Sequence, residues 1–259
     1  MKVSVSKINS SYPQNPPFHP DTKYPEYPLN DTTAETNEVY SAVRENFRLL
    51  GYDIINFGTA HWNPLGHIIK PGQTVFVKPN FVDHKHRFNE DIWSVITHPS
   101  VIRAVCDYVA IALRGKGRIV IGDNPHVDAE FDDIRKISYL DELSLLYKKN
   151  FKVECTIVDL RQWHMRDLKY YGFEEGRVKL SGDPLGVSTI NLGDKSLLRN
   201  IPVFWLRGTY TDRKETIKHH IFDTQEYIFS NSILSAHVFI SIPKLKAHSK
   251  VGVTLNIKG

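Results

Sequence analysis

The chain has 259 residues, of which 41% are hydrophobic and 24% charged, as is ordinary for a globular protein with a sizeable core. The formal net charge of +4 is mild and no basic stretch is interleaved with aromatic residues, so nucleic-acid binding is not predicted. No apolar run reaches the about 18 residues of a membrane span, and the amino terminus lacks the apolar region of a secretory signal. We therefore expect a cytoplasmic protein.

The two cysteines, Cys106 and Cys155, lie far apart in the sequence and within apolar patterns. Neither belongs to a Cys-x-x-Cys pair, so we expect no iron–sulfur cluster to be ligated by this chain alone. Cys106 falls beside the apolar stripe of an expected helix, which favours a small core residue over a reactive thiol.

The amino-terminal segment, residues 1–36, is expected to form a short strand followed by an extended arm. Residues Lys2–Lys7 alternate between polar and apolar side chains. The arm, residues 10–31, contains six prolines and several tyrosines, which disfavours a packed helix. A helix is predicted from Asn37 to Leu50, with Gly51 as its stop signal. We assign residues 37–259 to an α/β domain.

A strand, a helix and a second strand follow one another in the next part of the chain. The segment Pro71–Asn80 reads as a turn and a buried strand, and Arg118–Gly122 reads as another. Between them, Thr97-His98-Pro99-Ser100 begins a helix, with Thr97 as the expected cap and Pro99 in the first turn. This order predicts a Rossmann-like α/β fold, with a parallel or mixed sheet flanked by helices.

The remaining elements extend this sheet. We expect a helix at residues 133–149, a strand at 152–160, and an insertion or small β-rich subdomain at 165–213. A helix at 224–234 would then lead into the strand His237–Ile242, whose continuous apolar run predicts burial on both faces.

The segment after this strand is basic. Pro243 ends the strand, because proline lacks the N–H that a central strand donates. It is followed by four cations and an imidazole: Lys244, Lys246, His248, Lys250 and Lys258. A solvated basic loop is the ordinary interpretation. The apolar strand before the cluster favours instead a half-buried loop that faces an anion.

Polar residues also follow the other expected strands. Lys78-Pro79-Asn80 ends one strand, and Asp123-Asn124 ends another. Because the carboxyl ends of parallel strands meet at one edge, we expect one crevice, with the helix start at His98 beside it. The candidate catalytic residues are His248, His98 and Asp123. The candidate substrate-binding residues are Lys78, Asn80, Asn124, Lys244, Lys246 and Lys258.

Each of these candidates also has a purely structural interpretation. Lys78 could be a solvated strand-end lysine, His98 an ordinary first-turn residue, and Asp123 and Asn124 turn formers. His84 and His86 have the spacing of a metal-binding pair, although such a pair in a polar loop is usually solvated. The cofactor is therefore left unknown, with a divalent metal as one candidate.

Four motifs resemble those of domain-of-unknown-function family 362. In order, they are PGQTVFVKPN, THPSVIRAV, RIVIGDNP and IPKLKAHSKVGVTLNIKG, between Pro71 and Gly259. The family has no agreed general reaction. Some members carry ferredoxin-like cysteine motifs, which this chain lacks. His237 and Ala247 depart from the family's usual residues. Family members continue beyond Lys258-Gly259, so the resemblance implies that the C-terminal part of the family domain is missing.

A more distant likeness is to the nickel-pincer lactate racemases. The spacing from His248 to Lys258 is similar to their His…Lys segment, in which the lysine attaches the cofactor and the histidine moves protons. The Thr97-His98 element also resembles their helix start. This likeness implies shared architecture more than a shared cofactor.

Two hypotheses of function follow from these observations. In the first, the chain is an enzyme for a small anionic substrate, carboxylate or phosphate, whose reaction class (proton transfer, redox or metal-assisted) is open. In the second, it is a non-catalytic binding or scaffold protein that presents a ligand or cofactor to a partner, with the arm as contact surface. A homo-oligomer or a redox partner is compatible with either hypothesis.

Overall fold

The fold is described by a computed structural model, which covers residues 2–9, 11–166, 176–206, 213–248 and 252–254. Two compact units make up the chain. The first unit comprises Met1–Pro125, Glu130–Val158 and Ala236–Gly259, and the second comprises His126–Ala129 and Asp159–Ser235.

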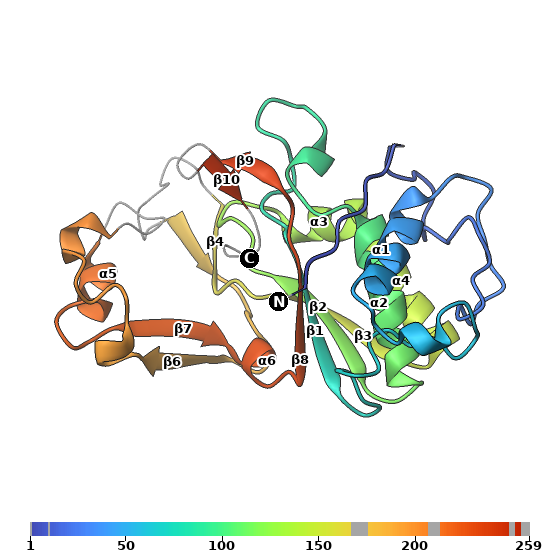
Figure 1. Ribbon diagram of the computed structural model, residues 1–259. Helices are drawn as coiled ribbons and strands as arrows, with labels where there is room; N and C mark the ends of the chain where they lie inside the picture. Colours follow the sequence, from blue (N-terminus) through green and yellow to red (C-terminus); the bar gives the residue numbers. More distant parts are fainter. Residues whose placement is uncertain (1, 10, 167–175, 207–212, 249–251, 255–259) are drawn as a thin grey trace. The chain divides into compact units, whose positions relative to one another are not determined.

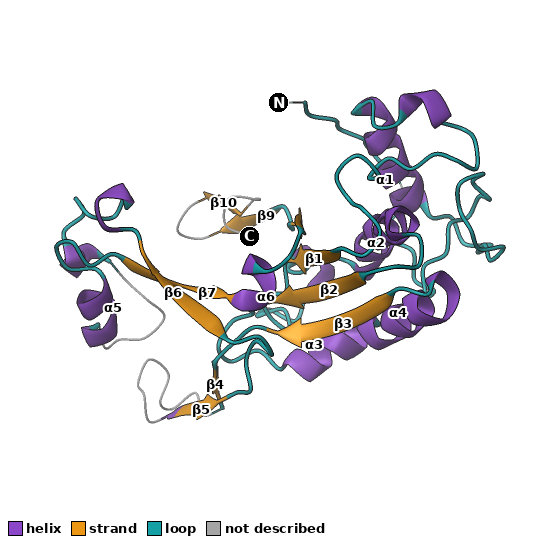
Figure 2. Cartoon of the chain, turned by 90° about the horizontal axis from the view of Figure 1, so that it is seen from below, coloured by secondary structure: helices purple, strands orange, loops and turns teal. Residues whose placement is uncertain are grey.

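The first unit is built on a four-stranded sheet with the order β3-β2-β1-β8. The strands are β1 (Thr74–Pro79), β2 (Arg118–Asp123), β3 (Glu154–Asp159) and β8 (Val238–Ile242). β1 pairs in parallel with both β2 and β8, and Figure 2 shows the arrows of β2 and β3 pointing the same way. The α/β fold class predicted from the sequence is therefore confirmed, with the sheet wholly parallel.

The centre of this sheet forms the core. Val75, Phe76 and Val77 of β1 are fully buried, as the apolar pattern predicted. The prediction that the last strand is buried on both faces was wrong. β8 lies at the end of the strand order, and Phe239 remains 45% exposed. An apolar run alone does not distinguish a central strand from an edge strand.

Two long helices pack beside the sheet (Figure 1). α1 (Glu38–Leu49) packs on α2 (Pro99–Leu113), which in turn contacts β1 and β2. The Asn37 side chain caps α1 by accepting the Tyr40 N–H, as the sequence pattern favours. The expected cap of α2 was displaced by one residue, because His98 rather than Thr97 is its N-cap.

The helix expected at residues 133–149 is interrupted. The chain forms α3 (Phe131–Ile137), α4 (Leu140–Leu146) and a π-helical turn η3 (Tyr147–Phe151). The break falls at Tyr139, whose φ of 50° is left-handed and cannot continue an α-helix. The apolar period continues across the break, so the sequence pattern did not reveal it.

The amino-terminal segment contains no strand at residues 2–9, contrary to the sequence prediction. Val3 and Val5 are 75% and 81% exposed, so their alternation with polar residues does not reflect a half-buried strand. The arm that follows is tied to the body of the unit. Arg103 of α2 donates hydrogen bonds to the Pro17 carbonyl and to the Tyr27 hydroxyl, at 2.9 and 2.7 Å.

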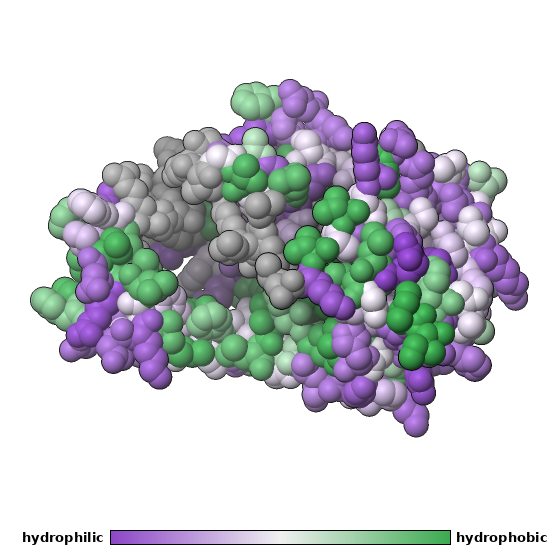
Figure 3. All heavy atoms as spheres, viewed as in Figure 1, coloured by the Kyte–Doolittle hydropathy of each residue, from purple (hydrophilic) through white to green (hydrophobic). Residues whose placement is uncertain are grey.

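The second unit contains two antiparallel pairs of strands. β4 (Trp163–Met165) pairs with β5 (Arg177–Lys179), and β6 (Val187–Asn191) pairs with β7 (Glu226–Ser230). The helix expected at 224–234 was wrong, since Glu226–Ser230 forms β7 and only α6 (Asn231–Leu234) is helical. Hydrophobic side chains lie at the surface along β6 and β7 (Figure 3).

Short elements complete the described fold. The first unit has 3-10 turns η1 (Ile54–Asn56) and η2 (Ile92–Ser94), and a hairpin of β9 (Lys246–His248) and β10 (Gly252–Thr254). The second unit has α5 (Lys214–His219), η6 (Gly193–Lys195) and η7 (Val203–Trp205). Among the helices described, none has the length and apolar character that crossing a membrane requires.

Candidate functional site

The ends of β1 and β2 are joined by an ion pair. The Lys78 ammonium lies 2.6 Å from Asp123 Oδ1. The other carboxylate oxygen of Asp123 accepts the backbone N–H of Phe81 at 2.6 Å, and Asp123 is buried. The structure therefore brings these two candidates together, at what we call the carboxyl edge: residues 78–80, 123–124 and 242–248.

The ends of β1 and β8 are joined by Thr97. Its hydroxyl donates to the Ile242 carbonyl at 2.8 Å and accepts the Asn80 N–H at 3.0 Å. The backbone of Thr97 also donates to the Asn80 carbonyl at 3.0 Å. Thr97 is buried. It fixes the separation of the two strand ends and the start of α2, a role that its expected function as a helix cap did not suggest.

Two further candidates donate hydrogen bonds to the same backbone carbonyl, that of Val95. Val95 O accepts a hydrogen bond from Lys246 Nζ at 2.9 Å and one from Asn80 Nδ2 at 3.2 Å. Lys246 is half-buried, and this hydrogen bond holds its ammonium group against the loop before α2. The hairpin residue Lys246 and the strand end at Asn80 are thereby positioned together.

Lys244 and His98 meet around a tyrosine of the arm. The Tyr12 ring stacks on the His98 imidazole with a centroid separation of 4.2 Å and an interplanar angle of 2°. Lys244 Nζ donates to the Tyr12 hydroxyl at 3.1 Å. The Trp93 ring packs edge-on against His98 at 4.4 Å. Neither aromatic residue was a candidate from the sequence, since a tyrosine in a proline-rich arm carries no signal for where it packs.

The imidazole of His98 is held neutral by these surroundings. Its Nδ1 accepts the Ser100 N–H at 3.1 Å, which is the capping bond of α2. Burial, and secondarily the positive charge of Lys244, lower the pKa of His98 to about 3. Its geometry is that of a helix cap, and its acid–base role remains a prediction.

His248 lies in β9, two residues after Lys246. Because side chains alternate along a strand, Lys246 and His248 share one face of the hairpin. Both are half-buried. His248 is paired in register with Gly252 of β10. Asn124 is exposed, and the structure does not bring it into contact with the other described candidates. The candidate Lys258 and the neighbouring Lys250 lie outside the described residues.

The part of the chain that the structure describes contains no preformed set of metal ligands. No group of three or more His, Cys, Asp or Glu side chains is placed there to hold a metal ion. His84 Nδ1 accepts the Glu130 N–H at 3.1 Å, and His86 Nδ1 accepts the Phe88 N–H at 3.3 Å. Both imidazoles thus have a structural task in their loop.

The cysteines are buried, as expected for Cys106. Burial raises the pKa of Cys106 well above its usual range and that of Cys155 to about 12. Both side chains are free thiols within the core. Their thiols are therefore protonated at neutral pH.

Comparison with known proteins supports the family resemblance. The model of the family described as "Domain of unknown function (DUF362)" matches residues 75–169. The matched segment runs from β1 through α2 and β2 to β4, and so contains Lys78, His98 and Asp123. No curated protein and no solved structure matches the chain.

Proposed function

We propose that the carboxyl edge binds a small anion, carboxylate or phosphate, and that the chain is an enzyme acting on this anion. The observation that carries the proposal is the strand order. The first three strands of this sheet are added in one direction, from β1 to β2 to β3. The fourth strand of the sheet, β8, lies on the other side of β1. In open parallel sheets, ligands bind outside the strand ends where the order reverses in this way.

The charges at this position favour an anion. Lys78, Lys244 and Lys246 are half-buried around the ends of β1 and β8. Asp123 pairs with Lys78, whereas the partner of Lys244 is the neutral Tyr12 hydroxyl. A half-buried ammonium next to a backbone-lined strand end is a suitable point-charge contact for a carboxylate or phosphate oxygen.

Each candidate residue has a distinct role in this proposal. Lys244 and Lys246 bind the anion, and Asp123 keeps Lys78 oriented at the end of β1. His248 shares a face of β9 with Lys246 and is the acid–base group, because imidazole titrates near neutral pH. Asn80, Asn124 and Lys258 complete the predicted substrate contacts. A divalent metal could bind together with the substrate.

The second candidate function is a non-catalytic binding protein. The arm contributes Tyr12 to the carboxyl edge, and this contact favours a segment that opens when a partner binds. In that case the anion would be retained without being converted. The two functions predict different results in one experiment.

The experiment is a turnover screen with a matched pair of variants. Wild-type protein is incubated with a set of small carboxylates and phosphate esters, with and without divalent metal ions, and products are followed by proton NMR. The enzyme hypothesis predicts turnover that His248→Ala abolishes and His67→Ala retains, His67 being exposed on another loop. Equal turnover by the His248 variant would refute its catalytic role, and binding without turnover would favour the second function.

A further inference from the structure

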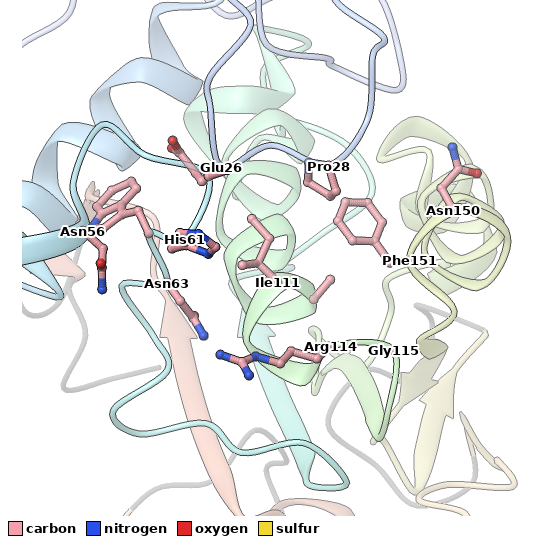
Figure 4. Close-up of a pocket in the computed structure, with 13 residues that line it drawn as sticks. Glu26, Pro28, Asn56, His61, Asn63, Ile111, Arg114, Gly115, Asn150 and Phe151 are labelled. Atoms are coloured by element: carbon pink, nitrogen blue, oxygen red, sulfur yellow. The ribbon is translucent and has the colours of Figure 1, made fainter.

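A cavity of about 620 Å³ lies at the opposite end of α2 from His98. Its walls come from the arm, the loop after α1, the end of α2 and the π-helical turn η3 (Figure 4). All of these segments belong to the first unit. The volume is in the range of sites for small molecules. The 15 residues of α2 span about 22 Å at 1.5 Å per residue, so this cavity is separate from the carboxyl edge.

One side of the cavity is polar and carries a cation. His61, Asn63 and Arg114 lie along this side in Figure 4. No described residue forms an ion pair with the exposed Arg114 guanidinium. Asn63 Oδ1 is buried and has no hydrogen-bond partner among the described residues. This oxygen is an acceptor withdrawn from the surface and gives an anion no contact, so Arg114 is the group of this side with which a ligand anion can pair.

The acidic residue of the cavity is already neutralised. Glu26 accepts two hydrogen bonds from the Arg44 guanidinium, at 2.6 and 3.2 Å, and a third from the Tyr108 hydroxyl at 3.0 Å. Arg114 is thus the charge at the cavity that no protein group balances in the described residues. An anionic group on a ligand would balance this positive charge, in the bidentate contact that a guanidinium favours.

The other side of the cavity is apolar. Pro28, Ile111 and Phe151 form this side (Figure 4). Such a surface accommodates a flat hydrocarbon part of a ligand and gains from removing it from water. The polar and apolar sides together fit an amphiphilic anion better than they fit inorganic phosphate.

The polar wall is held in place before any ligand arrives. Asp53 Oδ1 accepts the Asn56 amide at 2.8 Å, and Asp53 Oδ2 accepts the Asn63 N–H at 2.7 Å. Arg114 has a φ of 51°, a left-handed conformation that glycine adopts more readily. This conformation ends α2, since Arg114 is its C-cap.

We infer that this cavity is a second binding site, which takes a small aromatic carboxylate. The carboxylate pairs with Arg114 and accepts from the amides beside it, and the ring lies against Ile111 and Phe151. This inference concerns a different site from the proposed function and does not depend on it.

The test is calorimetric titration with 2-naphthoate and with its neutral analogue 2-naphthamide. Arg114→Gly removes the guanidinium and leaves a residue suited to the left-handed backbone, so the variant stays folded. Arg114→Gln is a second variant, and Arg118→Gln is the control, since exposed Arg118 does not line the cavity. Saturable binding of 2-naphthoate, weakened about tenfold or more in both Arg114 variants and unchanged in the control, is expected.

Three results would overturn the inference. They are no saturable binding of 2-naphthoate by the wild-type protein, equal binding by the Arg114 variants, and equal affinity for 2-naphthamide. The second result would place the binding elsewhere, for example at the exposed apolar side chains of the second unit. A melting temperature measured for each variant excludes unfolding as the cause of lost binding.

Discussion

The ammonium of Lys78 lies 2.6 Å from a carboxylate oxygen of Asp123, and this pair joins the carboxyl ends of two neighbouring parallel strands. The pair is largely withdrawn from water, since the two side chains are 16% and 7% exposed. Asp123 also receives the Phe81 N–H, which is buried with it. The loop that follows β1 therefore depends on one carboxylate of β2.

Replacing Asp123 by asparagine should destabilise the fold. The substitution leaves Lys78 without its counter-ion and makes the acceptor of the Phe81 N–H a neutral amide, so we expect a loss of about 1–3 kcal/mol. The free energy of unfolding measured in urea checks this value. Asp133→Asn is the control, because its partner Lys136 is 75% exposed and such pairs contribute about 0–1 kcal/mol. Equal losses of stability for the two substitutions would contradict the conclusion that the Lys78–Asp123 pair stabilises the fold.

His98 should make stability depend on pH. Its pKa is lowered to about 3 in the folded chain, against 6.5 for the ordinary imidazole. Between these values the unfolded chain binds a proton that the folded chain does not, so stability is complete above pH 6.5 and falls as pH decreases towards 3. Denaturation curves at several pH values measure this slope.

The matched variant for this prediction is His98→Asn. Asparagine can still cap α2 by accepting the Ser100 N–H, but it does not titrate. The variant should therefore lose this part of the pH dependence. A titration of the His98 ring by NMR with a midpoint near 6.5 would show that its surroundings do not hold it neutral.

A second buried ion pair lies within α2, and its arginine also donates hydrogen bonds to the arm. Arg103 and Asp107 are one helical turn apart. Arg103 Nε lies 2.7 Å from Asp107 Oδ1, and both side chains are fully buried. The Asp107 carboxylate also accepts hydrogen bonds from the hydroxyl groups of Tyr40 and Tyr147, at 3.0 and 2.9 Å. We expect Asp107→Asn to cost about 3–5 kcal/mol, because it leaves a buried guanidinium unpaired.

The milder change Tyr147→Phe tests the same network. It removes one of the hydrogen bonds to Asp107 and keeps the ring, so a loss of about 1 kcal/mol is expected. Both losses are to be measured as changes in the free energy of unfolding in urea. A loss below about 1 kcal/mol for Asp107→Asn would show that the network contributes little to the stability of the fold.

Local patterns were sufficient to predict the centre of the fold. β1, α2 and β2 each combine an apolar period with clear end signals, namely Lys78-Pro79, His98-Pro99 and Asp123, and each was predicted within a few residues. From their order we expected a parallel or mixed sheet with its strand-end residues at one edge, and Lys78 and Asp123 lie together there.

The errors concern features that local patterns do not encode. Whether β8 is central or at an edge depends on what else pairs with it, and β7 is a strand because β6 lies beside it. The contact of Tyr12 with His98 joins residues 86 positions apart in the sequence, and no spacing rule relates them. The roles of Thr97 and Val95 depend on a backbone geometry that exists only in the folded chain.

The measurement that tests the central claim most directly is calorimetric titration of a small anion onto the carboxyl edge. Inorganic phosphate and pyruvate are titrated into wild-type protein, into Lys244→Gln, and into Lys148→Gln, whose lysine is exposed on η3. We predict saturable binding of at least one anion, weakened about tenfold or more by Lys244→Gln and unaffected by Lys148→Gln. Absence of saturable binding, or the same affinity in both variants, would contradict the assignment of the carboxyl edge as an anion site.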